Sequence, residues 1–175
     1  MDMTLLDKDT VRIKGKKASL IVDPSQKSPK SPADCVILLG KEGALERVEG
    51  ARLVVNDDGE YEVGGIKITG STNDGSGIVY GLNVDGTQVI LAKTSTVEKL
   101  ADTGSEADIA VLNVDSLLNE AVVASLEAKA IVLYGERASE GLKALGKQDL
   151  SAVRKVTLGK EKIPAESETQ IVWLG

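Results

Sequence analysis

The sequence predicts an α+β fold, in which a meander of short strands is followed by a parallel βαβ element. The first half of the chain consists of short β-branched runs separated by Gly, Asn and Asp, and after Leu91 longer apolar runs alternate with amphipathic segments. A chain of 175 residues can bury roughly 70% of its extended surface, which is enough for a core without disulfides. Because each half needs the other to cover its apolar face, we expect one domain over residues 1–175.

Tight turns separate the strands that we expect in the first half. Asp85-Gly86 is typical of a two-residue hairpin turn, and Gly64-Gly65 separates two further β-branched runs. The proline-containing segment 24–32 is expected to be a loop. The predicted strands are residues 11–14, 19–22, 35–39, 52–55, 61–63, 66–69, 77–84 and 87–91.

The second half alternates strands and helices, which favours parallel strand pairing. Residues 109–114 and 129–134 are continuous apolar runs of the kind that form strands buried on both faces. Between them, Asp115 is the expected N-cap of a helix that extends to residue 128, with Leu117 and Leu118 on its apolar face. A second helix is predicted over residues 137–145 and ends at Gly146, and the remaining predicted strands are residues 153–158 and 170–174.

The chain contains no histidine. Histidine is the commonest metal ligand and the only side chain whose unperturbed pKa lies near neutrality. Its absence excludes Ser-His-Asp and Cys-His catalysis and histidine-ligated zinc. The single Cys35 begins an apolar run and has no partner for an intramolecular disulfide, so we expect an inert thiol.

Net charge and hydropathy limit the kinds of partner and the cellular compartment that we expect for this protein. The chain has 21 basic and 27 acidic residues, a net charge of −6, and no Lys/Arg stripe, so we expect no nucleic-acid partner. No apolar run approaches the ~18 residues of a membrane-spanning helix and no leader is evident, so we expect a cytoplasmic protein without membrane contact. We therefore expect the partner to be an unknown protein or small molecule. The apolar residues 171–174 are also compatible with contacts between copies of this chain in a homo-oligomer.

Several segments resemble the metallo-β-lactamase superfamily, most closely its small Zn-dependent hydrolases related to ascorbate-phosphate lactonase. The resemblance rests on residues 3–15 (MTLLDKDTVRIKG), 21–24 (IVDP) and 59–70 (GEYEVGGIKITG), in that order. It implies a four-layer αββα sandwich, reduced in size here. It also implies a metal site at one edge, where loops from both sheets meet.

The same resemblance implies that the metal ligands have been lost. The His-x-His-x-Asp-His loop of the superfamily aligns with Gly40, Glu42, Ala44 and Leu45, its bridging Asp falls near Thr94, and its last His falls near Gly135. Gly, Ala and Leu supply no lone pairs to a metal. We therefore expect no catalytic residue and no cofactor at these six positions.

Four polar residues remain as candidates for the pocket itself, namely Lys8, Asp23, Asp74 and Lys93. Lys93 lies beside the expected bridging position, where its ammonium group would take the place of a metal and could pair with Glu42. The leading hypothesis is a catalytically degenerate, metal-free binding or assembly module. The alternative is a hydrolase of small phosphorylated or lactone substrates, with a carboxylate metal site rebuilt around Glu42, Asp23 and Asp74.

Overall fold

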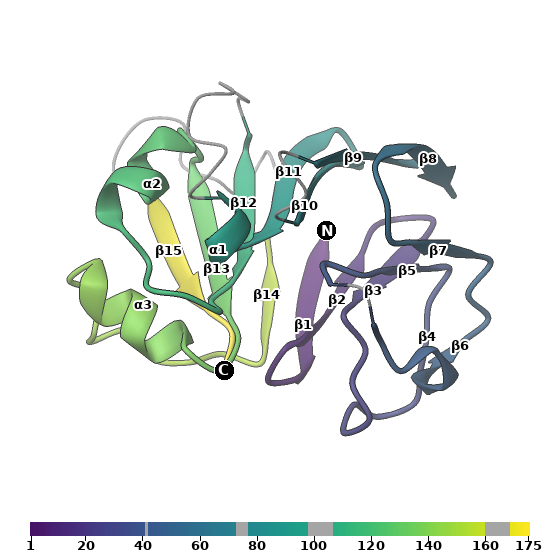
Figure 1. The fold of residues 1–175 in the computed structure, drawn as a ribbon, viewed down its shortest axis with the longest axis horizontal. Coiled ribbons are helices and arrows are strands. Elements are labelled where there is room, and N and C mark those ends of the chain that lie inside the picture. Colours follow the sequence, from purple (N-terminus) through teal and green to yellow (C-terminus); the bar gives the residue numbers. More distant parts are fainter. Residues whose placement is uncertain (41, 73–76, 98–106, 160–168) are drawn as a thin grey trace.

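Two β-sheets pack face to face in the computed structural model, which describes residues 1–40, 42–72, 77–97, 107–159 and 169–175 (Figure 1). The first sheet has six strands in the order β14-β1-β2-β3-β5-β7. The strands from β14 to β3 pair antiparallel, and β5 and β7 continue the sheet parallel to β3. Their bounds are β1 Asp2–Asp7, β2 Thr10–Lys14, β3 Ser19–Val22, β5 Cys35–Ile37, β7 Leu53–Val55 and β14 Lys155–Thr157.

The second sheet has seven strands in the order β15-β13-β12-β11-β10-β9-β8. Strands β8 to β11 form an antiparallel meander, and β11, β12, β13 and β15 run parallel. Within this sheet, the arrangement confirms the predicted change from a meander to a parallel βαβ element. The prediction of a meander over the whole first half is wrong for β3, β5 and β7, which pair parallel in the other sheet. The bounds are β8 Gly59–Val63, β9 Ile66–Thr72, β10 Ile78–Val84, β11 Thr87–Lys93, β12 Ile109–Asn113, β13 Ala130–Tyr134 and β15 Gln170–Trp173.

The main apolar core lies between the two sheets and is built almost entirely from aliphatic side chains. Side chains that face this core from the first sheet include Met3, Ile13 and Leu20, one from each of three strands. Leu82 and Val132 face it from the second sheet. A second core covers the opposite face of the seven-stranded sheet, beneath the helices, and includes Ala110, Leu112, Ile131, Leu133 and Leu142. Strands β12 and β13 are therefore buried on both faces, as their continuous apolar sequence predicts.

The helices are shorter than predicted. The expected helix over residues 115–128 is observed only as α2 (Glu120–Ser125), and the second helix is α3 (Ala138–Ala144). Asn119 caps α2 by accepting a hydrogen bond from the Ala121 amide at 2.9 Å, so the prediction of Asp115 as the N-cap is wrong. The predicted place of Leu117 on the apolar face is also wrong, because this side chain is 71% exposed. A further short helix, α1 (Thr94–Val97), follows β11 directly and has no periodic signal in the sequence.

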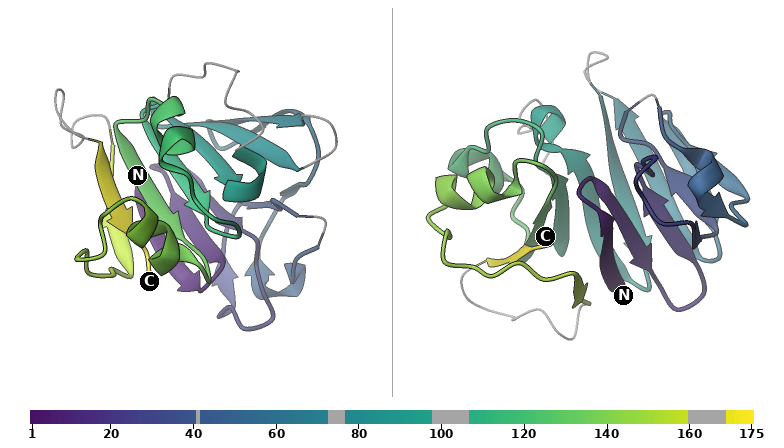
Figure 2. Two further views of the ribbon diagram at one scale, coloured as in Figure 1. Left: turned by 60° about the vertical axis from the view of Figure 1, so that its left-hand side comes forward. Right: turned by 90° about the horizontal axis from the view of Figure 1, so that it is seen from below.

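The helices α2 and α3 pack on the outer face of the seven-stranded sheet (Figure 2, left). The outer face of the six-stranded sheet carries the 3-10 helix η1 (Leu45–Arg47) and a short parallel pair, β4 (Ser31–Pro32) with β6 (Val48–Glu49) (Figure 2, right). These segments bury Ile21 and Val36, which point away from the central core. The αββα arrangement is thus present in a reduced form, with two mixed sheets and few helices.

Strand prediction misses β1, β4 and β6, and it overextends the strand at residues 153–158. Only Lys155–Thr157 belongs to β14, while Val153 forms an isolated bridge with Leu174. Because β1 lies between β14 and β2, its place depends on partners distant in sequence. None of the helices in the described parts of the chain is long and apolar enough to cross a membrane.

We predict that replacing Ile131 by Ala lowers the free energy of unfolding by ~2 to 5 kcal/mol, because the side chain is fully buried between the sheet and the helices. Urea denaturation measures this loss. The matched control is Leu117→Ala, which removes an exposed side chain and should cost less than ~0.5 kcal/mol. Equal losses in the two variants would contradict the burial of β13.

Candidate functional site

Three neighbouring parallel strands end at one edge of the seven-stranded sheet in polar residues. Lys93 ends β11, Asn113 ends β12 and Tyr134 ends β13, and the strand register pairs Lys93 with Asn113 and Asn113 with Tyr134. Their odd-even position matches that of Leu91 and Val111, which face the six-stranded sheet. The three side chains therefore leave the same face of the sheet, where the aliphatic core ends.

The six-stranded sheet brings two acidic residues to the same end of the sandwich. Asp23 directly follows β3 and has a positive φ of 44°. Its backbone amide donates to Ile37 at 3.0 Å, and its Oδ1 accepts from the Leu39 amide at 2.8 Å. Asp9 lies in the turn between β1 and β2, and its Oδ1 accepts from Asn113 Nδ2 at 3.3 Å. The Asp9 contact joins the two sheets across the site.

Two adjoining clefts open at this edge. One has a volume of about 550 Å³ and includes Asp9, Asp23, Glu42 and Asn113 in its lining. The other has a volume of about 740 Å³ and is lined by polar groups that include Asn56, Asp57, Thr72, Ser95 and Thr96. Both clefts share Gly40, Lys93 and Asp115. Lys93 thus lies at the boundary between them.

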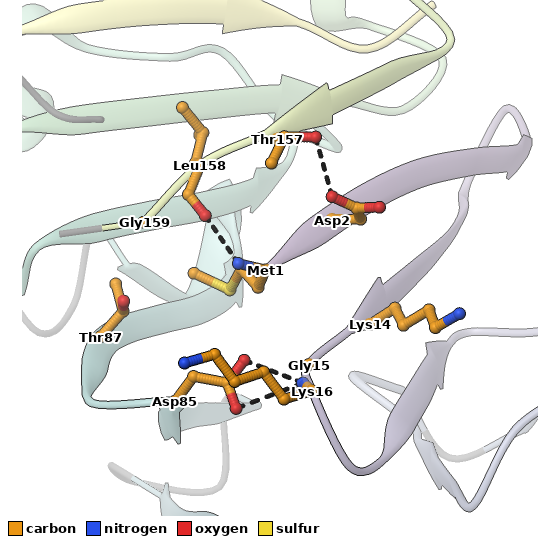
Figure 3. Close-up of a pocket in the computed structure, with 10 residues that line it drawn as sticks. All are labelled: Met1, Asp2, Lys14, Gly15, Lys16, Asp85, Thr87, Thr157, Leu158 and Gly159. Atoms are coloured by element: carbon orange, nitrogen blue, oxygen red, sulfur yellow. Dashed lines mark hydrogen bonds between the residues drawn. The ribbon is translucent and has the colours of Figure 1, made fainter. Parts of the chain in front are cut away.

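A cleft of about 400 Å³ occupies the other end of β11, between Thr87 and the N-terminal strands (Figure 3). Its acidic groups are bound within the protein. Asp85 accepts from the Lys16 amide at 2.9 Å, and Asp2 accepts from Thr157 at 2.8 Å and pairs with Lys155 at 2.7 Å. These contacts join the β10–β11 turn to the β2–β3 turn, and β1 to β14, so we assign this cleft a structural role.

Burial dominates the electrostatics of Asp23. It raises the pKa of this carboxyl from 3.8 to about 6. Hydrogen bonds from the Leu39 and Gly40 backbone and the positive charge of Lys93 lower the pKa, while Asp9 raises it further. No described carboxylate lies within ion-pair distance of the Lys93 ammonium, so Lys93 acts on Asp23 through the local field.

Asp115 is held in its charged form by a compact hydroxyl cluster. Burial alone would raise its pKa, but hydrogen bonds from Ser95 and Thr94, together with the charge of Lys93, hold the pKa below its usual value. The Ser95 hydroxyl donates to Asp115 Oδ2 at 2.6 Å, and the Thr94 hydroxyl donates to Oδ1 at 3.0 Å. This engagement explains why Asp115 does not begin the predicted helix.

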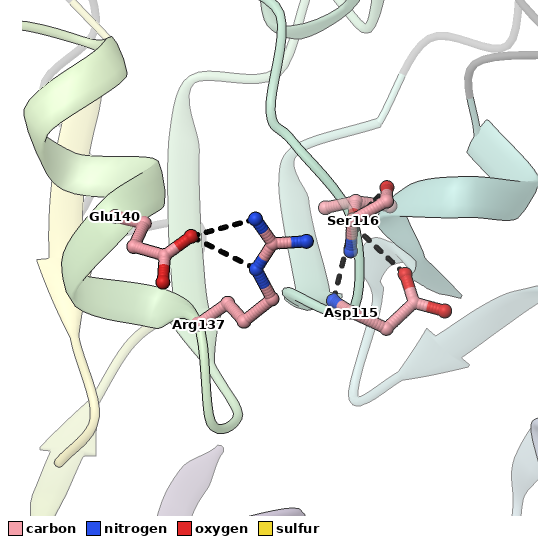
Figure 4. Close-up of polar contacts among 5 residues, drawn as sticks. Asp115, Ser116, Arg137 and Glu140 are labelled. Atoms are coloured by element: carbon pink, nitrogen blue, oxygen red, sulfur yellow. Dashed lines mark hydrogen bonds and ion pairs between the residues drawn. The ribbon is translucent and has the colours of Figure 1, made fainter.

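Thr94 ties the end of β11 to the segment after β12. Its fully buried hydroxyl oxygen accepts from the amides of Asp115 at 3.2 Å and Ser116 at 3.1 Å. Figure 4 shows the Asp115–Ser116 turn, with the ion pair between Arg137 and Glu140 (2.7 Å) on the neighbouring helix. A small hydroxyl side chain at this position therefore holds the backbone of the site.

The hydroxyl group of Tyr134 is buried and makes no hydrogen bond within the described parts of the chain. Asn113 acts on it electrostatically without completing a hydrogen bond of good geometry, and the charges of Asp23 and Asp9 also reach it. Burial raises the pKa of Tyr134 well above its ordinary value, so the hydroxyl stays protonated. It is a neutral buried group that the charges of Asp23 and Asp9 reach, and it lines neither of the two clefts.

The structure brings only some of the sequence candidates together. Of the six positions aligned with lost ligands, Gly40, Glu42 and Ala44 line the 550 Å³ cleft, whereas Leu45 lies in η1 and is 42% exposed. Thr94 serves the backbone contacts described above. Gly135 lies beside Asn113, where an added Cβ would come within 3.0 Å of the Asn113 Oδ1.

The four pocket candidates also separate. Asp23 and Lys93 line the site, whereas Lys8 lies outside both clefts with its exposed ammonium 4.0 Å from Glu136. Asp74 falls outside the described residues. The suggested ion pair between Lys93 and Glu42 is not formed, although both residues line the same cleft.

The sequence patterns do not single out Asp9, Asn113, Asp115 or Tyr134 as site residues. A usable signal exists for Asn113, because a polar residue directly after the apolar run of β12 marks the carboxyl end of a parallel strand. Asp9 carries no such signal, since it lies far from Asn113 in sequence and meets it only through the packing of the two sheets.

Solved structures with the same architecture are known. No protein-family model matches the sequence, and neither does any curated protein. A crystal structure from Thermotoga maritima, assigned as a Zn-dependent hydrolase of the metallo-β-lactamase superfamily, matches with a TM-score of 0.74 at 21% identity, over 99% of this chain and 98% of that chain. The protein has the metallo-β-lactamase fold.

Two further structures with this fold agree. A protein from Parabacteroides distasonis assigned as a metal-dependent hydrolase matches with a TM-score of 0.59 at 17% identity, over 82% of this chain and 87% of that chain. A metallo-β-lactamase fold protein from Bacillus subtilis matches with a TM-score of 0.59 at 10% identity, over 98% of this chain and 95% of that chain. These likenesses, all at 21% identity or below, show a shared fold.

The residues at this edge do not fit the zinc centre that the metallo-β-lactamase fold implies. Within the described ranges, no group of three or more His, Cys, Asp or Glu residues is arranged to hold a metal ion. The nearest oxygen donors are already engaged, since Asp23 accepts from Leu39 and Asp115 accepts from Thr94 and Ser95. The fixed positive charge of Lys93 at the centre of the site further opposes a bound cation.

We predict that Asp23→Asn removes a pH dependence of stability between about pH 4 and pH 6. The folded-state pKa of about 6 lies above the ordinary 3.8, so the stability contributed by protonated Asp23 is full below pH 4 and is lost as the pH rises through 6. Asn tolerates the positive φ and still accepts from Leu39, and the variant should gain up to about 3 kcal/mol relative to wild type between pH 4 and pH 7.

Urea denaturation across this pH range measures the difference, with the exposed Asp57→Asn as the matched control. Parallel stability curves for wild type and Asp23→Asn would show that burial does not perturb this carboxyl group.

Proposed function

We propose that this protein is a catalytically degenerate, metal-free member of the metallo-β-lactamase fold that acts as a binding or assembly module. The observation that carries the proposal is the ammonium of Lys93, which lies at the shared boundary of both clefts, beside Thr94, the position that the resemblance aligns with a bridging metal ligand. A tethered positive charge cannot be displaced by substrate, and it activates no water.

The chemistry of the site supports the same proposal. Catalysis by a metal hydrolase needs an acidic bound water, and zinc generates one through imidazole and carboxylate ligands with an open coordination position. The chain contains no imidazole, and Gly40, Ala44 and Leu45 stand at positions aligned with metal ligands. The clefts persist without these ligands, because backbone contacts of Asp23 and Thr94 hold their walls.

The test is titration calorimetry with Zn²⁺, Mn²⁺ and Mg²⁺ on the full chain, combined with turnover assays on β-lactam, lactone and phosphodiester substrates. We expect no stoichiometric binding at micromolar concentrations and no turnover above background. Thermal unfolding provides an independent reading, since a metal at one hundred times its dissociation constant would add ~2.7 kcal/mol to stability.

The rival hydrolase with a rebuilt carboxylate site makes the opposite prediction. Micromolar metal binding with turnover, both abolished by Glu42→Ala and both retained in Glu140→Ala, would overturn the proposal. Glu42 lines the cleft, whereas Glu140 lies on α3 and pairs with Arg137, so the two variants separate an effect at the site from a general loss of negative charge.

A further inference from the structure

The edge strands of the two sheets differ in length and in how far they are already covered. Strand β15 is bridged along its outer side by Val153, whose amide donates to the Trp173 carbonyl at 2.9 Å and whose carbonyl accepts from the Gly175 amide at 3.2 Å. The edge strands β7 and β14 contain three residues each. Strand β8 is the longest of these edge strands, with five residues, and lies at the end of its sheet opposite α2 and α3 (Figure 1).

The turn after β8 determines which backbone groups of this strand stay free. Gly64-Gly65, with positive φ at both residues, joins β8 to β9 as a two-residue hairpin turn. In such a hairpin the flanking residues Val63 and Ile66 form a hydrogen-bonded pair, and hydrogen-bonded and non-hydrogen-bonded pairs then alternate along both strands. Glu60 and Glu62 therefore occupy non-hydrogen-bonded positions, where their backbone N–H and C=O groups point away from β9.

The rest of the antiparallel meander agrees with this register. Alternation from the second two-residue turn, Asp85-Gly86, directs the odd-numbered residues of β10 toward β9, where they pair with Lys67, Thr69 and Ser71. The even-numbered residues of β9 are left to bond β8. Two turns thus lead to the same result, and within the described ranges no other backbone group bonds to the outward side of β8.

The side chains of β8 divide between the core and the outside. Val63 is buried in the main core and Tyr61 packs against it, whereas Glu60 and Glu62 are exposed on the outer face of the sheet. Among the described residues, neither glutamate forms an ion pair, and Lys67, which is opposite Glu62 in the strand register, is also unpaired. The free backbone edge therefore carries a negative charge on its outer face.

This charge determines which kind of strand the edge accepts. A strand that bonds to the outward backbone groups places its own side chains next to those of Glu60 and Glu62, on the same face. A second copy of β8 would place glutamate opposite glutamate, and like charges in that position destabilise a strand pair. A strand with Lys or Arg at alternate positions would place opposite charges there. The exposed Asp57 and Asp58 in the turn before β8 add to the negative charge.

We propose that β8 is a docking edge for an extended segment of a partner protein that carries Lys or Arg at alternate positions. The segment extends the seven-stranded sheet by one strand. Main-chain hydrogen bonds to Glu60 and Glu62 supply affinity, and the two carboxylates supply selectivity. This inference names the partner class of the proposed assembly module and rests on that function. No residue of β8 lines either cleft, so the edge and the clefts are tested separately.

The probe is the peptide acetyl-Thr-Val-Lys-Val-Lys-Val-Thr-amide, titrated into the full isotope-labelled chain and followed by the amide resonances of Glu60 and Glu62. One matched peptide replaces both lysines by glutamine. Another carries N-methyl groups on the backbone nitrogens of both lysines, which removes the donors that would face β8 and keeps the charges.

We expect the lysine peptide to shift both resonances and to protect both amides from hydrogen exchange. It should bind at least ~5-fold more tightly than the glutamine peptide at ~0.05 M salt, and this difference should shrink at ~0.5 M salt. Equal binding of the lysine and N-methylated peptides, or no binding at about 5 mM peptide, would overturn the proposal.

Charge reversal locates the binding edge. Glu60→Lys combined with Glu62→Lys should reverse the preference, so that a peptide with glutamate in place of both lysines binds more tightly. The matched control, Glu120→Lys with Asp149→Lys, makes the same change in net charge at exposed positions outside β8 and should keep the wild-type preference. If the reversed variant does not fold because of repulsion from Lys67, Glu60→Gln with Glu62→Gln should abolish the preference. An unchanged preference in the folded β8 variant contradicts the proposal.

Other outcomes are distinguishable from these. Concentration-dependent shifts of the Glu60 and Glu62 amides without peptide would show that β8 pairs with a second copy of the chain, which would also overturn the proposal. Failure of the lysine peptide contradicts this inference alone, whereas zinc binding with turnover contradicts the metal-free function.

Discussion

Burial of aliphatic side chains between the two sheets is the constraint on which the rest of the structure depends. With no Phe and only four aromatic residues, three Tyr and one Trp, the core between the sheets is assembled from many Val, Ile, Leu and Ala contacts. Such a core fixes which residues of each strand face inward, because a shift by one residue would turn every side chain to the other face. Lys93, Asn113 and Tyr134 are placed by this register at the point where the core ends.

The packing of the two sheets therefore fixes the position of the site, and the charged groups at that position fix its electrostatics. Beyond the core, backbone groups of Leu39 and Gly40 and the field of Lys93 stabilise the charge of the partly buried Asp23. In a hydrolase of this fold, a metal would supply the positive charge. Here one covalently attached ammonium supplies a smaller charge, and the cleft stays acidic.

The hydroxyl cluster around Asp115 stabilises the charge of this carboxylate and also holds the backbone at the ends of two strands. Thr94 and Ser95 begin the short helix α1, and their contacts with Asp115 connect the ends of β11 and β12. The same contacts prevent Asp115 from capping a helix, so that α2 begins only after Asn119. Asp115 thus fixes the geometry of the cleft edge, whereas Asn119 fixes the start of α2.

The sequence by itself determined the order of meander and βαβ element, the burial of β12 and β13, and the exclusion of histidine chemistry. Those features follow from local patterns and composition, in which each residue carries its own signal. Only the tertiary structure decided that Asp9 contacts Asn113, that Thr94 holds the Asp115 turn, that Lys8 lies outside both clefts, and that the Tyr134 hydroxyl has no hydrogen-bond partner among the described residues. These contacts join residues far apart in the chain, and their energies depend on burial and distance, which arise only when the two sheets close on each other.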